Sequence, residues 1–171
     1  EDGFGTTLNP YKITNWTQLQ NINNSNILTQ NYYFNLLNNL SSSTSDYTNL
    51  ASNTANGGLG WNPIGNNTNK FTGKFDGLGH TISNLKIDKS SETYQGLFGK
   101  TSGSLIRNIG LVNVNIVGRN YAGGLVGYNY DGAISNSYAT GTVSGDWYIG
   151  GLLGYNYGTT TNSYATGTVS G

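Results

Sequence analysis

The carboxylates of this 171-residue chain are few and scattered. The chain contains eight Asp and Glu residues and one His, and Asp76, Asp88, Asp131 and Asp146 are widely spaced. Hydrolysis by two carboxylates requires a facing pair about 5–10 Å apart, and this spacing predicts none. Asp76 and His80 are four residues apart in a Gly-rich turn, where we expect them to hydrogen-bond each other and stabilise the turn. The sequence therefore predicts no catalytic residue and no enzyme.

The sequence also favours neither a cofactor nor a metal site. Cys and Met are both absent, which excludes disulfides and thiolate ligands. The segment Gly77-Leu78-Gly79 has no following Lys and helix, as a phosphate loop requires, so it predicts a turn. Eight Lys and Arg balance the eight acidic residues without any run of like charge, which argues against nucleic-acid binding. No apolar stretch is long enough to span a bilayer, so we expect no membrane insertion.

Aromatic residues are the better candidates for binding. Exposed rings flanked by Asn suit the apolar faces and hydroxyls of sugars, or a protein receptor. The alternative is that the rings pack on one another as a ladder that stabilises the fold. The candidate ligand contacts lie in two Tyr-Asn-Tyr segments 27 positions apart and in the turns before two Gly-Gly pairs: Tyr121, Tyr128, Tyr130, Trp147, Tyr148, Tyr155 and Tyr157.

These aromatic residues belong to an internal repeat. Residues 124–130 (GLVGYNY) return as residues 151–157 (GLLGYNY), and residues 136–145 return unchanged as residues 162–171. A period of 20–50 residues is typical of solenoids and propellers, and this unit is too short for the four antiparallel strands of a propeller blade. Gly, Asn, Thr and Ser, all poor helix formers, make up more than half of the chain. The sequence predicts an all-β, right-handed parallel β-helix.

The repeats predict columns of equivalent side chains. The pattern Ile-x-Asn-apolar predicts a structural ladder of stacked amides inside the solenoid, formed by Asn84, Asn108, Asn136 and Asn162. Two aliphatic columns are expected to fill the interior beside it. One consists of Ile87, Leu111, Ala139 and Ala165, and the other of Leu97, Leu125 and Leu152.

The chain divides into a cap region and the repeats. We expect residues 1–59 to form an N-terminal cap with a short helix over residues 14–22, whose Trp16, Leu19 and Ile22 share one face. A strand over residues 33–40 and a surface excursion over residues 41–58 should follow. Residues 60–171 should form the rungs, with repeats at 96–123, 124–150 and 151–171. Because no capping element follows the last repeat, we expect a fragment of a longer repeat protein.

Specific segments resemble a known family. Residues 60–65 (GWNPIG), residues 71–85 (FTGKFDGLGHTISNL) and the Gly-Leu-apolar-Gly-Tyr-Asn repeats resemble the GLUG-motif regions of large bacterial secreted and surface proteins. Such regions occur in filamentous-haemagglutinin-like adhesins and secreted exoproteins, and beside some immunoglobulin A protease domains. The resemblance covers about residues 8–171 and carries no catalytic residue list. After Tyr33 the chain has Asn and Leu where relatives carry an acidic strand, which argues against a metal role there.

The resemblance implies a secreted or cell-surface module. Our first hypothesis is a non-catalytic, adhesin-type β-helical binding or stalk segment of a bacterial surface protein, active in cell adhesion. Its partners would be a receptor or glycan on a host or neighbouring cell, and further repeats of the same polypeptide. The alternatives are an accessory module of a secreted protease or polysaccharide-active enzyme, and a purely structural stalk or surface-layer segment.

Overall fold

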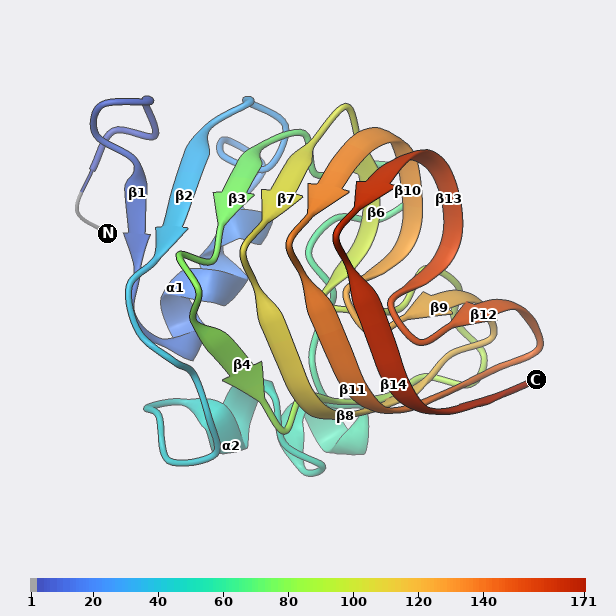
Figure 1. Ribbon diagram of the computed structural model, residues 1–171. Coiled ribbons are helices and arrows are strands. Elements are labelled where there is room, and N and C mark those ends of the chain that lie inside the picture. Colours follow the sequence, from blue (N-terminus) through green and yellow to red (C-terminus); the bar gives the residue numbers. More distant parts are fainter. Residues whose placement is uncertain (1–2) are drawn as a thin grey trace.

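The strands of this chain pair in parallel, each with the equivalent strand one turn further along (Figure 1). The computed structural model describes residues 3–171. The first sheet consists of β1 (Tyr11–Ile13), β2 (Tyr33–Leu36), β3 (Lys74–Asp76), β6 (Phe98–Ser102), β7 (Leu105–Arg107), β10 (Val126–Ser135) and β13 (Leu153–Thr161). The second consists of β4 (Thr81–Ser83), β5 (Lys86–Asp88), β8 (Gly110–Val117), β11 (Tyr138–Ser144) and β14 (Tyr164–Ser170). A third, two-stranded sheet pairs β9 (Asn120–Gly123) with β12 (Trp147–Gly150).

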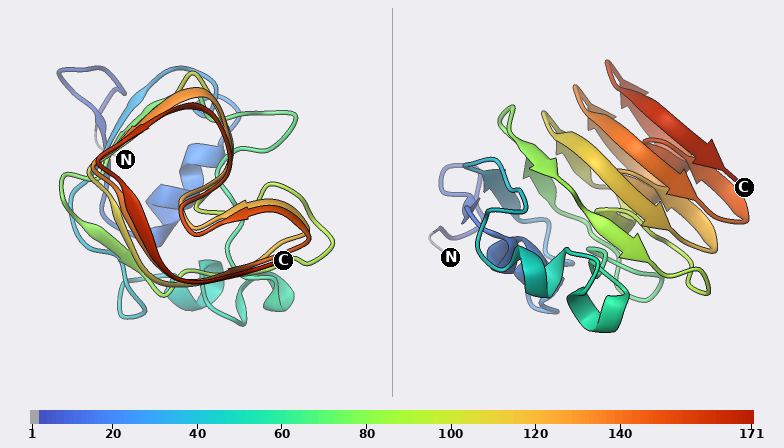
Figure 2. Two further views of the ribbon diagram at one scale, coloured as in Figure 1. Left: turned by 45° about the vertical axis from the view of Figure 1, so that its right-hand side comes forward. Right: turned by 90° about the horizontal axis from the view of Figure 1, so that it is seen from below.

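The strand order follows a solenoid. In the first sheet β1, β2, β3, β7, β10 and β13 lie side by side in chain order, and in the second β4, β8, β11 and β14 do the same. Seen down the axis, the C-terminal turns, coloured from yellow to red, are nearly superimposed (Figure 2, left). The prediction of an all-β parallel β-helix is confirmed.

Inward-facing apolar residues form continuous columns in the core. In the first sheet Phe34, Phe75, Ile106 and Ile134 are each opposite the next, and each is at most 2% exposed. Such columns bury a repeated apolar position against its neighbours above and below, which is how a solenoid forms a core. The predicted column of leucines is present as well, and its members are buried: Leu97, Leu125 and Leu152.

The other predicted aliphatic column has one wrong member. Leu111 is opposite Ala139 and Ala139 opposite Ala165, but Ile82 takes the first place and Ile87 is opposite Ile116. Ile82 and Ile106 share the pattern Ile-x-Asn-apolar, but Ile82 lies in the second sheet and Ile106 in the first. The turn between β3 and β4 is longer than the turn between β7 and β8, so the correct register is not evident from the sequence.

The predicted N-terminal helix is present as α1 (Trp16–Gln20), followed by a 3-10 turn (Asn21–Asn23). The Asn15 side chain caps the helix, because its Oδ1 accepts a hydrogen bond from the Gln18 backbone N–H at 2.8 Å. Trp16 and Leu19 are fully buried, and the Trp16 ring packs against that of Trp61. The helix therefore lies against the first turns, at the N-terminal end of the solenoid (Figure 2, right).

The segments around this helix complete the first turns. β1 and β2 already belong to the first sheet, so its hydrogen-bonded ladder begins at Tyr11, well before residue 60. Residues 41–58 contain two short helical pieces that the sequence did not predict, α2 (Tyr47–Leu50) and a 3-10 turn (Ala55–Gly58). Trp61 and Ile64 then return to the core, each with 0% exposure.

Candidate functional site

The predicted asparagine ladder lies at an outer corner of the solenoid. Asn108, Asn136 and Asn162 occupy equivalent positions after β7, β10 and β13, all with positive φ between 48° and 57°. Asn108 is half-buried, whereas Asn136 and Asn162 are exposed, and the amides of Asn136 and Asn108 are 3.4 Å apart. The prediction that Asn84 belongs to this column is wrong: its Oδ1 accepts from Asn113 Nδ2 at a different corner. Asn suits these positions because it tolerates the left-handed backbone conformation that they require.

A different asparagine makes the interior amide ladder. Asn129, with 0% exposure, accepts a hydrogen bond from Thr101 Oγ1 at 2.9 Å. Its Nδ2 donates to the Gly132 carbonyl oxygen at 3.0 Å and to Asn156 Oδ1 at 2.8 Å. This ladder was not among the predictions from the sequence, although Asn129 and Asn156 alternate with outward tyrosines in both copies of the repeat.

The glycines of the repeat create a concave elbow between β12 and β13, and between β9 and β10 one turn before (Figure 2, left). A Cβ on Gly127 would collide with the carbonyl oxygen of Tyr121, and one on Gly154 would lie 2.7 Å from that of Tyr148. The last glycine of each Gly-Leu-apolar-Gly motif therefore lets β9 and β12 approach the strands that follow them. That approach brings the tyrosines of the two strands into contact across the elbow.

Two columns of tyrosines line this elbow. Tyr94, Tyr121 and Tyr148 stack in parallel, with centroid distances of 5.2 and 4.9 Å and interplanar angles of 8° and 1°. Tyr128 stacks on Tyr155 at 4.9 Å in the second column. Edge-to-face contacts of 5.2 to 6.1 Å join the columns. We call these five residues the tyrosine face.

Lys100 continues the second column by one turn, because it is directly opposite Tyr128. Its ammonium lies 4.8 Å from the Tyr94 ring centroid and 4.7 Å from that of Tyr128. Asn67 Oδ1 accepts a hydrogen bond from the same Nζ at 2.9 Å. Lys100 and Tyr94 were not among the predicted site residues, since nothing in their local sequence repeats the Tyr-Asn-Tyr pattern.

The tyrosine face combines stability with hydrogen-bonding capacity. The two faces of the Tyr121 ring are covered by Tyr94 and Tyr148, so the column presents ring edges and hydroxyls to a ligand. Burial, and then the neighbouring Tyr155 and Tyr121, raise the pKa of Tyr128 above its ordinary value of 10.0. Burial and Tyr121 raise the pKa of Tyr94 in the same way. These phenols therefore remain protonated hydrogen-bond donors at neutral pH.

The remaining predicted aromatic contacts are not part of the two stacked columns, although Tyr130 neighbours Tyr128 on β10. Tyr130 and Tyr157 stack on each other at 5.6 Å and are 47% and 62% exposed. Trp147 is 71% exposed on β12. The structure thus brings four of the seven predicted residues together, namely Tyr121, Tyr128, Tyr148 and Tyr155.

Asp76 stabilises the turn as predicted, but through partners other than His80. Its Oδ1 accepts from the Leu78 backbone N–H and from Asn108 Nδ2, both at 2.9 Å, and its Oδ2 accepts from Arg107 Nε at 2.8 Å. His80 Nδ1 instead lies 3.2 Å from Asn39 Oδ1. The predicted Asp76–His80 hydrogen bond is wrong, because Leu78 adopts a positive φ that turns the chain between them.

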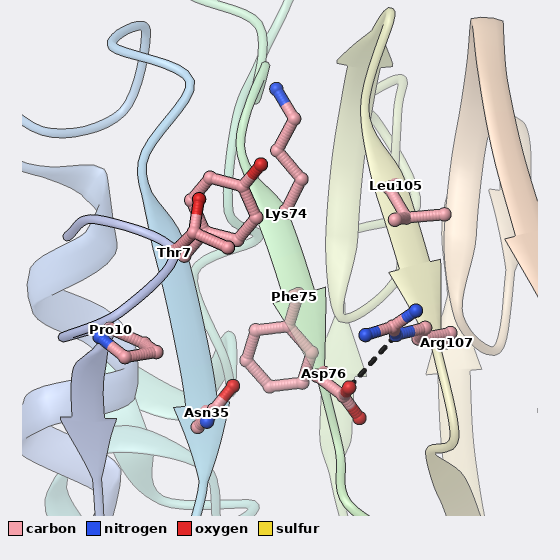
Figure 3. A pocket seen from close by; sticks show the side chains of 9 residues that line it. Thr7, Pro10, Asn35, Lys74, Phe75, Asp76, Leu105 and Arg107 are labelled. Atoms are coloured by element: carbon pink, nitrogen blue, oxygen red, sulfur yellow. Dashed lines mark hydrogen bonds and ion pairs between the residues drawn. The ribbon is translucent and has the colours of Figure 1, made fainter.

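The same carboxylate borders a small pocket on the outer side of β2, β3 and β7 (Figure 3). Burial disfavours the charged form of Asp76, but hydrogen bonds from Asn108, Leu78 and Arg107, with the Arg107 charge, hold its pKa below the ordinary value. Asp76 is therefore ionised at neutral pH and engaged in a structural ion pair, not poised as a general acid. Within residues 3–171, no three His, Asp or Glu side chains lie close enough together to hold a metal ion. Among the described residues, no helix has the length and the apolar composition needed to span a bilayer.

Comparison with known proteins identifies the repeats. The GLUG motif matches residues 118–144 and 145–170. Halomucin of Haloquadratum walsbyi is 39% identical over 148 residues, which are 84% of this chain and 2% of that protein. A protein of Evansella cellulosilytica named as a Gly-rich membrane protein is 35% identical over 138 residues, 78% of this chain and 15% of that protein. The chain thus spans only a small part of these curated relatives.

A solved structure shares the fold. A crystal structure of a protein from Bacteroides ovatus named as an immunoglobulin A1 protease has a TM-score of 0.71 and 26% sequence identity over 97% of this chain and 50% of that one. The fold and the repeated elbow define a parallel β-solenoid repeat segment. Its repeats are GLUG motifs, and the resemblance stated from the sequence is confirmed.

Proposed function

We propose that this chain is a non-catalytic attachment module of an extracellular surface protein, and that the tyrosine face contacts a glycan of a host or neighbouring cell. The observation that carries the proposal is the repetition of half-exposed tyrosines, turn after turn, along one concave side of the solenoid. An extended sugar chain presents hydroxyls at regular intervals. A row of phenol hydroxyls along the solenoid axis is complementary to such a chain.

The relatives support a location outside the cell. Halomucin and the Gly-rich membrane protein carry names that belong to surface proteins. Two features of the carboxylates support a non-catalytic role. They are scattered along the chain, and Asp76 forms an ion pair with Arg107.

Two other roles have an observation in their favour. A purely structural stalk is favoured by the mutual covering of the ring faces, which stabilises the solenoid without any ligand. An accessory role beside a protease is favoured by the name of the structural neighbour.

A glycan array probed with this chain tests the attachment proposal. The variant Tyr121→Phe with Tyr148→Phe keeps both rings stacked and removes two hydroxyls. We expect it to lose about two- to tenfold in affinity per hydroxyl for any glycan that the wild type binds. Tyr138→Phe is the matched control, because Tyr138 stacks on Tyr164 in the second sheet, away from the tyrosine face. No bound glycan, or equal binding by the Phe variant, would refute the proposal and favour the stalk.

A further inference from the structure

A polar cavity of about 300 Å³ lies where the N-terminal region meets the first rungs. One wall comes from the end of the 3-10 turn and from Leu28, a second from the loop at residues 62–69, and a third from residues 89–95. The cavity is at the lower end of the range for small-molecule sites, so it suits a single ring-sized ligand.

A buried cation with spare donors lines the cavity. The Lys89 side chain is only 8% exposed. Its Nζ has two distant partners, Glu92 Oε2 at 3.5 Å and Asn62 Oδ1 at 3.4 Å. An ammonium carries three donors, and burying it is costly unless they are well paired. Lys89 therefore has hydrogen-bonding capacity left for a ligand oxygen.

A second buried side chain in the cavity wall has an unpaired acceptor. Gln95 is 2% exposed, and its Nε2 donates to the Thr93 carbonyl oxygen at 2.9 Å. Its Oε1 has no partner among the residues that the structure describes. A buried amide oxygen without a donor is costly, so a ligand hydroxyl that donates to it would be favoured.

The rim supplies further amides and an apolar surface. Asn66 Oδ1 caps its own loop by accepting from the backbone N–H groups of Thr68 and Asn69, which leaves its Nδ2 unpaired in the described part of the chain. The side chain of Asn69 has no hydrogen bond there either. Leu28 and Tyr94 add apolar surface beside these amides.

From this lining we infer that the cavity binds one neutral pyranose ring. Amides donate to and accept from sugar hydroxyls, an ammonium donates to them, and an apolar wall packs against the C–H face of the ring. The lining carries one positive and one negative charge, Lys89 and Glu92, so it does not favour a charged ligand. The inference deepens the attachment role proposed above, on which it rests, and it assigns a second site that shares only Tyr94 with the tyrosine face.

Isothermal titration calorimetry on this chain tests the inference, with D-glucose, D-galactose, D-mannose and N-acetyl-D-glucosamine as separate probes. We expect at least one sugar to bind. Lys89→Met, which keeps the length of the side chain and removes the ammonium, should weaken that binding about tenfold or more. Asn69→Ala, at an exposed rim position, should weaken it about two- to fivefold without affecting folding.

The controls separate this site from the tyrosine face. Lys86→Met removes an ammonium from β5, outside the cavity, and should bind the sugar as the wild type does. Tyr121→Phe should also leave this binding unchanged, even where it weakens glycan binding on the array. The inference is overturned by a panel in which no sugar binds, or by wild-type affinity in Asn69→Ala and in a Lys89→Met variant of unchanged melting temperature.

Discussion

Replacing Asn129 with Ala tests the interior amide ladder. The substitution removes three hydrogen bonds of 2.8 to 3.0 Å from a side chain with 0% exposure. Asn156 is exposed and can turn its amide to water, but the Thr101 hydroxyl and the Gly132 carbonyl stay buried without this partner. At about 1–3 kcal/mol for each such group, the free energy of unfolding should fall by about 2–6 kcal/mol.

Urea unfolding followed by circular dichroism measures this loss. With an m value of about 2 kcal/mol/M, the midpoint should move down by about 1–3 M. Asn115→Ala is the matched control, because Asn115 lies on β8 with an exposed side chain that makes no hydrogen bond within residues 3–171. Its free energy of unfolding should change by less than about 0.5 kcal/mol.

A double variant distinguishes the ladder from a simple cavity. Thr101→Val removes the hydroxyl that Asn129→Ala leaves without an acceptor, so the combined loss should be smaller than the sum of the two single losses. Equal losses for Asn129→Ala and Asn115→Ala, or strictly additive losses in the double variant, would show that the ladder does not stabilise the protein as argued here.

Three further predictions concern the tyrosine face and the outer corner. Tyr121→Ala removes four ring contacts and should cost about 2–6 kcal/mol of unfolding free energy, whereas Tyr130→Ala removes one aromatic stacking pair and should cost about 0.5–1.5 kcal/mol; equal losses would contradict the stacking argument. Asp76 has a folded pKa below its unfolded value near 3.8, so its contribution is complete above that pH and is lost as the pH falls through the folded pKa; acid unfolding should be less pH-dependent in Asp76→Asn. Asn108→Ala should lower the melting temperature more than Asn108→Gly, because only Gly adopts φ 57° without strain, and the reverse order would show that the lost amide outweighs the backbone.

The architecture could be predicted because repetition is visible in a single sequence. Two copies of Gly-Leu-apolar-Gly-Tyr-Asn-Tyr at a fixed period require equivalent positions to stack, whatever the details of the turns. The alternation of Tyr128, Asn129 and Tyr130 placed two tyrosines on the outside, as the structure shows. The α1 helix was predictable too, since its cap and its apolar face lie within one short segment.

The candidate site could be predicted only in part. Tyr121 and Tyr128 are seven residues apart and belong to different sheets, and only the elbow at Gly124 to Gly127 brings their rings to 5.2 Å. Lys100 belongs to the site because the register of β6 and β10 places it opposite Tyr128, one turn earlier. A sequence pattern identifies such a position only when the residue type repeats.

The sequence by itself determined the period, the parallel stacking and the columns of repeated residues, because identical neighbours must pack on one another. Tertiary structure decided which asparagine is internal. Asn108 and Asn129 both recur one turn later, but the first lies at a corner with φ 57° and the second is in a strand with its amide turned inward. Because of the length of the turn between β3 and β4, Asn84 does not align with Asn108. Turn length and backbone handedness determine which side chains face the core, and both depend on contacts between segments far apart in the chain.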